Sequence, residues 1–199
     1  MKIRVLFLVS FMLSMLAIQS LFAQDSSSGQ ADMMKKYTAL MSPSANHKKL
    51  DGAVGKWDAS TEMWVGAPGS PSIKSKGTTE FEWAYDGRFL EEHLTADMMG
   101  SPMHGLGFTG YDNFKQKYTM FWIDNTSTSM YTAEGNFDST GTTLTLWGKM
   151  DDPMSGKSNL DAKYIMHVID KDTMTFEIDD MSKPEGSQKM ILTTYTRKK

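Results

Sequence analysis

The chain has 199 residues, no cysteine and a formal net charge of −3. Without cysteine there are no disulfides, so the packing of apolar side chains must stabilise the fold. The acidic balance argues against nucleic acid or an anionic membrane as a partner, because both attract clustered Lys and Arg. The only basic run, Arg197-Lys198-Lys199, is too short to form such a patch.

The N-terminus has the pattern of a secretory signal peptide, expected over residues 1–23. Lys2 and Arg4 precede an apolar run over residues 5–18, and polar residues follow Ala23. The run is shorter than the roughly 20 apolar residues of a spanning helix. We therefore expect cleavage after Ala23, export to the periplasm or cell exterior, and no stable membrane anchor. Cleavage removes two positive charges, which takes the net charge from −3 to −5.

Three further regions follow. Residues 24–30 are Gln, Asp, Ser and Gly, a composition typical of a flexible tether. Residues 31–52 form an N-terminal helical segment, in which apolar side chains recur at spacings of three and four before Ser42-Pro43 ends the first helix. That first helix either caps the domain or packs outside it. Residues 53–199 suit one domain.

Beyond Gly55 the pattern is that of β-strands. β-Branched and aromatic residues recur in short stretches separated by Gly, Asp, Asn and Pro. Phe81, Trp83 and Tyr85 alternate with Glu80 and Glu82, as on a half-buried strand. The expected strands are 55–64, 73–85, 88–98, 104–111, 116–124, 129–137, 142–150, 160–170, 173–181 and 188–197. Closure would remove exposed edges, so the predicted fold is all-β, an antiparallel barrel of about ten strands with a short N-terminal helix.

Two resemblances support this fold. Gly55-Lys56-Trp57 at the first strand and Arg197 at the last resemble the calycin superfamily, in which a Gly-x-Trp and a terminal Arg meet at the closed end of a barrel. In that resemblance Gly55, Trp57 and Arg197 have a structural role, with the guanidinium over the indole.

The second resemblance covers the chain from about His47 onward. Five ordered motifs resemble the bacterial domain of unknown function 1579 family. They are His47-Lys48-Lys49-Leu50 with Val54-Gly55-Lys56-Trp57, Asp86-Gly87-Arg88-Phe89-Leu90, Met98-Met99-Gly100-Ser101-Pro102-Met103-His104-Gly105, Gly110-Tyr111-Asp112-Asn113 and Trp122-Ile123-Asp124. Met103-His104 departs from the family pattern, which has an aromatic followed by a variable residue. The resemblance implies a lipocalin-like barrel and no established activity.

The candidate ligand-binding residues come mainly from these motifs. They are Arg88, His93, Met99, His104, Tyr111, Trp122 and Asp124. Arg88 and Asp124 could form a buried ion pair that fixes strand register, or a clamp on a ligand. The aromatic residues could line a cavity or fill a tight barrel; they are Trp64, Phe81, Trp83, Phe89, Tyr111, Phe121, Trp122 and Trp147. Six carboxylates could pair as acid and base, but carboxylates on alternating strands usually form the solvated face, where we expect them. They are Glu91, Glu92, Asp97, Asp124, Asp179 and Asp180.

Metal and haem chemistry have weaker support. Thioethers and an imidazole suit Cu(I), which makes Met98, Met99, Met103 and His104 weak copper candidates. His93, His104 and His167 could each supply one axial haem ligand, although His167 between Ile165 and Ile169 is more typical of a core or lumen histidine. No histidine pair has the spacing of a zinc site. We expect no cofactor.

The sequence contains no Gly-x-Ser-x-Gly elbow, no cysteine nucleophile and no phosphate loop. We therefore expect non-catalytic binding of a small apolar or amphipathic ligand inside the barrel, with Arg88 or a histidine orienting a polar head group. The alternatives are a haem protein or small enzyme that uses a histidine at the mouth, and a ligand-free structural or interaction barrel. The ligand and the oligomeric state are left open.

Overall fold

The computed structural model describes residues 29–65, 70–153, 155–183 and 186–199. The expected signal peptide and residues 24–28 of the expected tether lie outside this part of the chain. Two compact units are distinguished, residues 1–42 and residues 43–199. In the first, residues 29–41 form a helix that ends at the predicted Ser42-Pro43 stop. None of the helices in the described ranges is long and apolar enough to cross a membrane.

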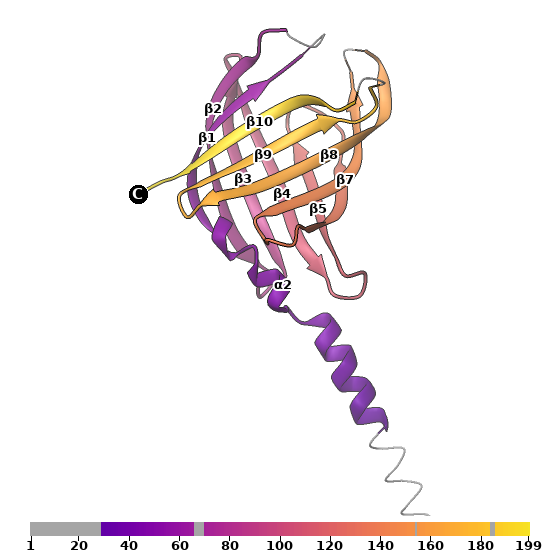
Figure 1. Ribbon diagram of the computed structural model, residues 1–199. Helices are drawn as coiled ribbons and strands as arrows, with labels where there is room; N and C mark the ends of the chain where they lie inside the picture. Colours follow the sequence, from indigo (N-terminus) through magenta and orange to yellow (C-terminus); the bar gives the residue numbers. More distant parts are fainter. Residues whose placement is uncertain (1–28, 66–69, 154, 184–185) are drawn as a thin grey trace, which may run out of the picture. The chain divides into compact units, whose positions relative to one another are not determined.

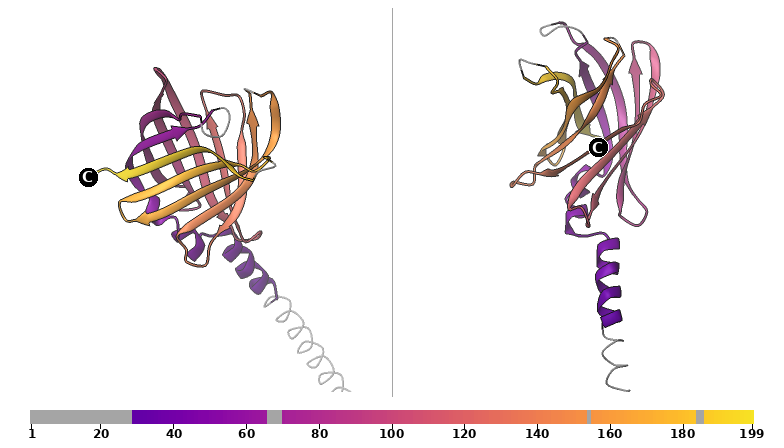
Figure 2. Two further views of the ribbon diagram at one scale, coloured as in Figure 1. Left: turned by 45° about the horizontal axis from the view of Figure 1, so that its top comes forward. Right: turned by 90° about the vertical axis from the view of Figure 1, so that its right-hand side faces the viewer.

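The second unit is a closed barrel of ten antiparallel strands (Figures 1 and 2). Each strand pairs with its neighbours in the chain, and β1 closes the barrel against β10. The predicted fold, an all-β antiparallel barrel of ten strands, is confirmed. The strands are β1 Gly55–Met63, β2 Ile73–Ala84, β3 Phe89–Met98, β4 Ser101–Asp112, β5 Lys117–Asp124, β6 Tyr131–Phe137, β7 Thr143–Asp152, β8 Lys157–Asp170, β9 Thr173–Asp180 and β10 Gln188–Arg197.

The register decides which side chains face inward. Trp57 pairs with Thr79 on β2 and with Arg197 on β10, and Phe81 pairs with Glu92 on β3. Because side chains alternate along a strand, each such layer continues around the wall. The alternation predicted for β2 holds for Phe81 and Trp83, which face inward.

Two turns differ from the sequence-based expectation. Tyr85 lies in the turn after β2 and is exposed rather than continuing the inward face of that strand. Residues 101–103, which were expected to precede the next strand, are part of β4. Met99 and Gly100 alone form the connection between β3 and β4, and both have positive φ, as a two-residue hairpin turn requires.

One end of the barrel is closed by the segment before β1. This segment contains the helix α2 (Ala45–Lys48) and the 3-10 turn η1 (Asp51–Ala53), and Figure 1 shows α2 beneath the strands. Leu50 and Ala53 are buried there. Tyr118 Oη donates a hydrogen bond to the carbonyl of Asn46 at 2.7 Å, and Trp57 Nε1 donates to the carbonyl of Ala53 at 2.8 Å. The segment is thus held by both packing and hydrogen bonds.

Arg197 completes the closed end. Its Cζ lies 4.0 Å from the centroid of the Trp57 ring. Its guanidinium donates hydrogen bonds to the carbonyls of Gly52, Val54 and Lys171 at 2.6, 2.7 and 2.9 Å. Gly55 has a φ of +124°, and a Cβ there would lie 2.8 Å from Arg197 Nη1. Glycine at position 55 therefore permits both the backbone turn and the close approach of the arginine.

Candidate functional site

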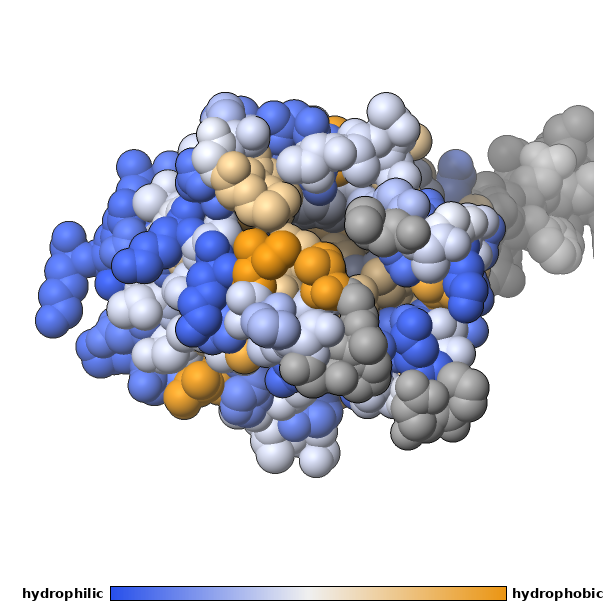
Figure 3. Space-filling view, turned by 90° about the horizontal axis from the view of Figure 1, so that it is seen from above, coloured by the Kyte–Doolittle hydropathy of each residue, from blue (hydrophilic) through white to orange (hydrophobic). Residues whose placement is uncertain are grey.

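Inward-facing side chains become more accessible from the closed end towards the other end, which we call the open end. Near α2 they are buried, as for Trp57, Leu90, Tyr118, Leu144 and Met174. Further along the strands many of them are half-buried, namely Thr61, Met63, Leu94, Ala96, Met98, Met120, Trp122, Met150, Phe176 and Ile178. Others in this half are buried, namely Ser75, Ala162, Tyr164, Asp180 and Thr193. An enclosed side chain keeps accessible surface only where the interior is not filled. Figure 3 looks onto the open end, where apolar atoms lie at the centre within a hydrophilic rim.

Glu92 lies at the boundary between the filled and accessible parts. It faces inward from β3, beside Phe81 on β2 and Gly107 on β4. Thr79 Oγ1 and Tyr195 Oη both donate hydrogen bonds to its Oε1, at 3.2 and 3.3 Å. Burial raises the pKa of Glu92 to about 7, although these two hydrogen bonds and the charge of His93 lower it.

The prediction that Glu92 lies on a solvated face is therefore wrong. Its inward neighbours on β3 are Leu90 and Leu94, so the carboxyl interrupts an otherwise apolar face. That interruption was visible in the sequence, because residues two apart on a strand share a face. The contacts from Thr79 and Tyr195 were not visible, since they come from β2 and β10.

Trp122 is the aromatic neighbour of Glu92. It faces inward from β5, opposite Gly107 on β4. A Cβ at Gly105 would lie 2.2 Å from Trp122 Cζ2, and a Cβ at Gly107 would lie 3.0 Å from Trp122 Cε3 and 3.5 Å from Glu92 Cβ. The two glycines therefore leave room for the indole to lie along β4, next to Glu92.

Two further carboxylates expected on the solvated face also point inward. Asp124 accepts a hydrogen bond from Trp122 Nε1 at 2.9 Å. Burial alone would raise the pKa of Asp124, but hydrogen bonds from Thr126 and Trp122 outweigh it and hold that pKa below its usual range. Asp180 is buried near the open end, and its Oδ2 lies 3.3 Å from Lys183 Nζ.

The residues predicted as a ligand site do not form one cluster. Trp122 and Asp124 are in contact within the barrel. Tyr111 faces inward at the closed end, where its ring centroid lies 4.8 Å from that of Tyr118. Met99 is in the β3–β4 turn and 74% exposed, and His104 is exposed on the outside of β4.

Arg88 lies in the turn before β3, where Nη1 donates to the carbonyl of Tyr85 at 3.1 Å and lies 3.6 Å from Asp86 Oδ2. Because Phe89 pairs with Gly110 and Asp124 with Gly105, Arg88 and Asp124 are separated by about 17 Å along β4. The two residues therefore do not form the ion pair or shared clamp considered above.

None of the three strand histidines points into the barrel interior. His93 is exposed on the outside of β3, with Nε2 2.8 Å from Glu91 Oε1. His167 is exposed on the outside of β8, where Nδ1 lies 2.9 Å from Thr143 Oγ1, so the expectation of a core or lumen position is wrong. His47 is buried in α2, and its Nδ1 accepts a hydrogen bond from the Ser44 amide at 2.9 Å. Burial, followed by the charge of Arg88, lowers the pKa of His47.

The copper candidates also diverge. Met98 and Met103 are half-buried on inward-facing positions, whereas Met99 and His104 are exposed outside. The four side chains therefore do not converge on one ion. Among the described residues, no group of three His, Cys, Asp or Glu side chains could hold a metal ion.

Residues 42–197, from the segment before α2 to Arg197, match a protein family described as "Protein of unknown function (DUF1579)". The chain belongs to the DUF1579 family. The match includes every strand of the barrel, its closed end and the interior residues Glu92 and Trp122. No curated protein matches the chain.

A solved structure shares the fold of this DUF1579 chain. The crystal structure of Rv2717c from M. tuberculosis is 14% identical with a TM-score of 0.54, and the alignment covers 79% of this chain and 100% of that one. At this identity the likeness shows the fold alone. A redesigned β-barrel, b11L5F_LGL, is also 14% identical, covering 77% of this chain and 96% of its own, but its TM-score is only 0.39.

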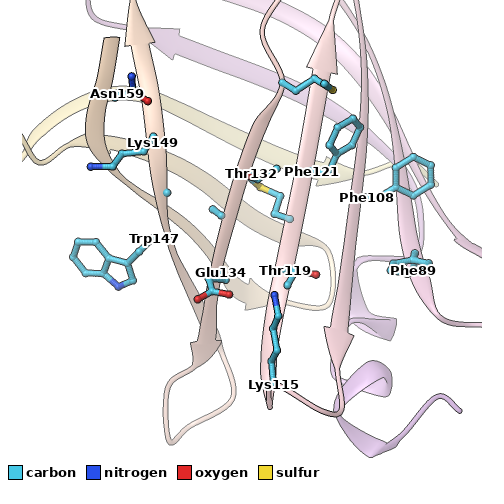
Figure 4. Close-up of a pocket in the computed structure, with 14 residues that line it drawn as sticks. Phe89, Phe108, Lys115, Thr119, Phe121, Thr132, Glu134, Trp147, Lys149 and Asn159 are labelled. Atoms are coloured by element: carbon cyan, nitrogen blue, oxygen red, sulfur yellow. The ribbon is translucent and has the colours of Figure 1, made fainter. Parts of the chain in front are cut away.

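The DUF1579 barrel also has a groove on its outer wall, of about 750 Å³ (Figure 4). Residues of β3 to β8 and of two connections line it, with Phe89, Phe108 and Phe121 on one side and Trp147 on the other. Trp147 is 53% exposed. Three aromatic residues considered for the interior, Phe89, Phe121 and Trp147, therefore lie outside.

Proposed function

We propose that this protein is exported and binds a small apolar or amphipathic molecule inside a lipocalin-like barrel, without catalysing a reaction. The observation that carries the proposal is the graded exposure of the inward-facing side chains. At the closed end most of them are buried. Towards the open end many keep accessible surface, although Ser75, Ala162, Tyr164, Asp180 and Thr193 are buried there as well. A barrel filled throughout would bury both halves alike.

The chemistry of the accessible half suits such a ligand. Leu94, Met120, Phe176 and Ile178 supply apolar surface, whose burial contributes about 25 cal/mol per Å². Several inward positions there are methionine, a flexible side chain that adapts to ligands of different shape. The signal-peptide pattern at the N-terminus supports export. Because the chain has no cysteine, packing must stabilise the protein without disulfides.

The haem and enzyme alternatives have less support. A histidine on the lumen wall would be needed for either, and the three strand histidines, His93, His104 and His167, project from the outside. The residues available to orient a polar group of a ligand inside the barrel are instead Glu92, Trp122 and Asp124.

A fluorescence titration with N-phenyl-1-naphthylamine, a neutral apolar probe, tests the proposal. We expect saturable binding at one molecule per barrel. Leu94→Trp adds bulk at an inward position and should abolish this binding. Thr95→Trp adds the same bulk at the next residue, which points outward, and should bind as the wild type does. Circular dichroism confirms that both variants are folded.

A second variant tests the outer groove as the binding site. Trp147→Ser removes the largest aromatic side chain of the groove and leaves the interior unchanged. Binding that survives Trp147→Ser but not Leu94→Trp places the probe inside. Binding lost in Trp147→Ser and kept in Leu94→Trp, or no saturable binding to the wild type, would overturn the proposal.

A further inference from the structure

The inward-facing charges of the barrel are mainly acidic. Glu92, Asp124 and Asp180 face inward, and Asp180 lies 3.3 Å from Lys183. In the strand ladders of the described residues, the inward-facing cation is Arg197, which is held at the closed end by three backbone carbonyls. Among the described strand residues, the accessible half of the barrel therefore presents carboxylates and no inward-facing cation that could receive an anionic group.

Glu92 has an oxygen available for a ligand. Both of its hydrogen bonds, from Thr79 and Tyr195, reach Oε1. Within the described residues Oε2 has no hydrogen-bond partner. The side chain is half-buried, so this oxygen lies on an accessible part of the interior rather than in sealed packing. A hydrogen-bond donor on a ligand would complete the carboxylate's interactions.

An aromatic side chain, Trp122, lies near the Glu92 side chain. Trp122 rests along β4. Gly107 lies between Trp122 and Glu92, and a Cβ at Gly107 would touch both side chains. The indole is also half-buried and keeps accessible surface. Asp124 holds the indole N–H, which fixes the ring in place.

A carboxylate next to the face of an indole is complementary to a positive charge. The carboxylate attracts an ammonium group directly, and the negative face of the indole quadrupole attracts it by a cation–π interaction. The same site disfavours a carboxylate ligand, because two like charges would meet where solvent screens them poorly. A neutral hydroxyl would gain the hydrogen bond but not the charge interaction.

We propose that the barrel selects amphiphiles that carry an ammonium group, which lies between Glu92 and Trp122 while the apolar chain extends towards the open end. This inference rests on the proposed function, because it names the head group of the ligand bound inside. The chain would pack on Leu94, Met120 and Phe176, which face inward on the open side of Glu92.

Three ligands with the same twelve-carbon chain test the head group: dodecylammonium, dodecanol and dodecanoate. Each is kept below its critical micelle concentration and titrated at pH 8 in competition with N-phenyl-1-naphthylamine. At that pH Glu92 is mostly ionised, because its pKa is about 7. We expect dodecylammonium to bind at least about tenfold more tightly than dodecanoate, with dodecanol between them.

Glu92→Gln is the matched variant, since it removes the charge and keeps an oxygen for Thr79 and Tyr195. It should weaken dodecylammonium binding about tenfold and leave dodecanol within about twofold. Glu82→Gln, on the exposed outer face of β2, should change neither affinity. Equal binding of all three ligands, or tighter binding of dodecanoate by the wild type, would refute the head-group assignment while interior binding stands. Failure of the naphthylamine probe to bind would instead refute the proposed function.

Discussion

Glu92 occupies a position where a carboxyl is difficult to ionise. Its backbone belongs to a strand whose other inward side chains nearby are apolar, and the two hydroxyls that reach it compensate only part of the lost hydration. Glu91, the preceding residue, points outward, where it contacts His93. The chemistry of each glutamate therefore follows from the face of the strand on which it lies.

The raised pKa of Glu92 predicts how stability depends on pH. The folded protein holds this proton up to about pH 7, whereas the unfolded chain releases it near its ordinary pKa of 4.5. The contribution of protonated Glu92 to the free energy of unfolding is therefore complete below pH 4.5 and is lost as the pH rises to 7. The loss is at most about 3 kcal/mol, and less if water reaches the half-buried side chain.

Urea unfolding at pH 5 and pH 8 measures this loss. The wild type should lose more stability than Glu92→Gln between the two values, because glutamine does not titrate. Glu82→Gln should follow the wild type. Asp124 does not interfere, since its pKa lies below its usual range and its contribution changes at lower pH. Equal losses in the wild type and Glu92→Gln would contradict the assignment.

Among the elements, β1 and β10 close the barrel by pairing along their length, and one side chain, Arg197, adds contacts across this closure. Arg197 lies at the end of β10, contacts the Trp57 ring on β1, and reaches carbonyls before β1 and in the β8–β9 turn. The planar guanidinium can serve several acceptors at once, and a lysine ammonium cannot match that geometry.

Arg197→Lys should therefore destabilise the protein although it keeps the charge. We expect a loss of about 2 kcal/mol in the free energy of unfolding, from hydrogen bonds and the cation–π contact. The comparison is Lys198→Met, which removes an exposed ion pair with Asp58 and should cost less than about 1 kcal/mol. Chemical denaturation measures both variants. Equal losses would show that the contacts of Arg197 contribute little.

At the scale of the whole molecule, the barrel and its closing segment form one unit from residue 43 onward. The closing segment contributes the buried side chains of His47, Leu50 and Ala53. The helix over residues 29–41 belongs to the other unit. The minimal stable barrel is therefore expected to begin near residue 43 rather than at the first strand.

Two truncations test this boundary. Removing residues 1–41 should leave the Tm within about 3 °C of that of the full chain. Removing residues 1–53 exposes the closed end and deletes the acceptors of Trp57 Nε1 and Tyr118 Oη. That loss should cost about 3 kcal/mol or more. Thermal unfolding followed by circular dichroism distinguishes the two. A barrel that keeps its Tm without residues 1–53 would show that the segment only covers it.

The sequence by itself determined the strands and their connections, because alternation along a strand and the residues of tight turns are local properties. Ten strands were placed within a few residues of their observed ends. The Trp57–Arg197 contact was also expected, since it resembles a known pattern at the two ends of a barrel. The tertiary structure alone decided which residues meet inside. Arg88 and Asp124, which the sequence suggested as a pair, lie near opposite ends of the barrel, whereas Thr79, Glu92 and Tyr195 come together from three strands. Strand register and closure set these contacts, and both depend on long-range pairing that no local pattern encodes.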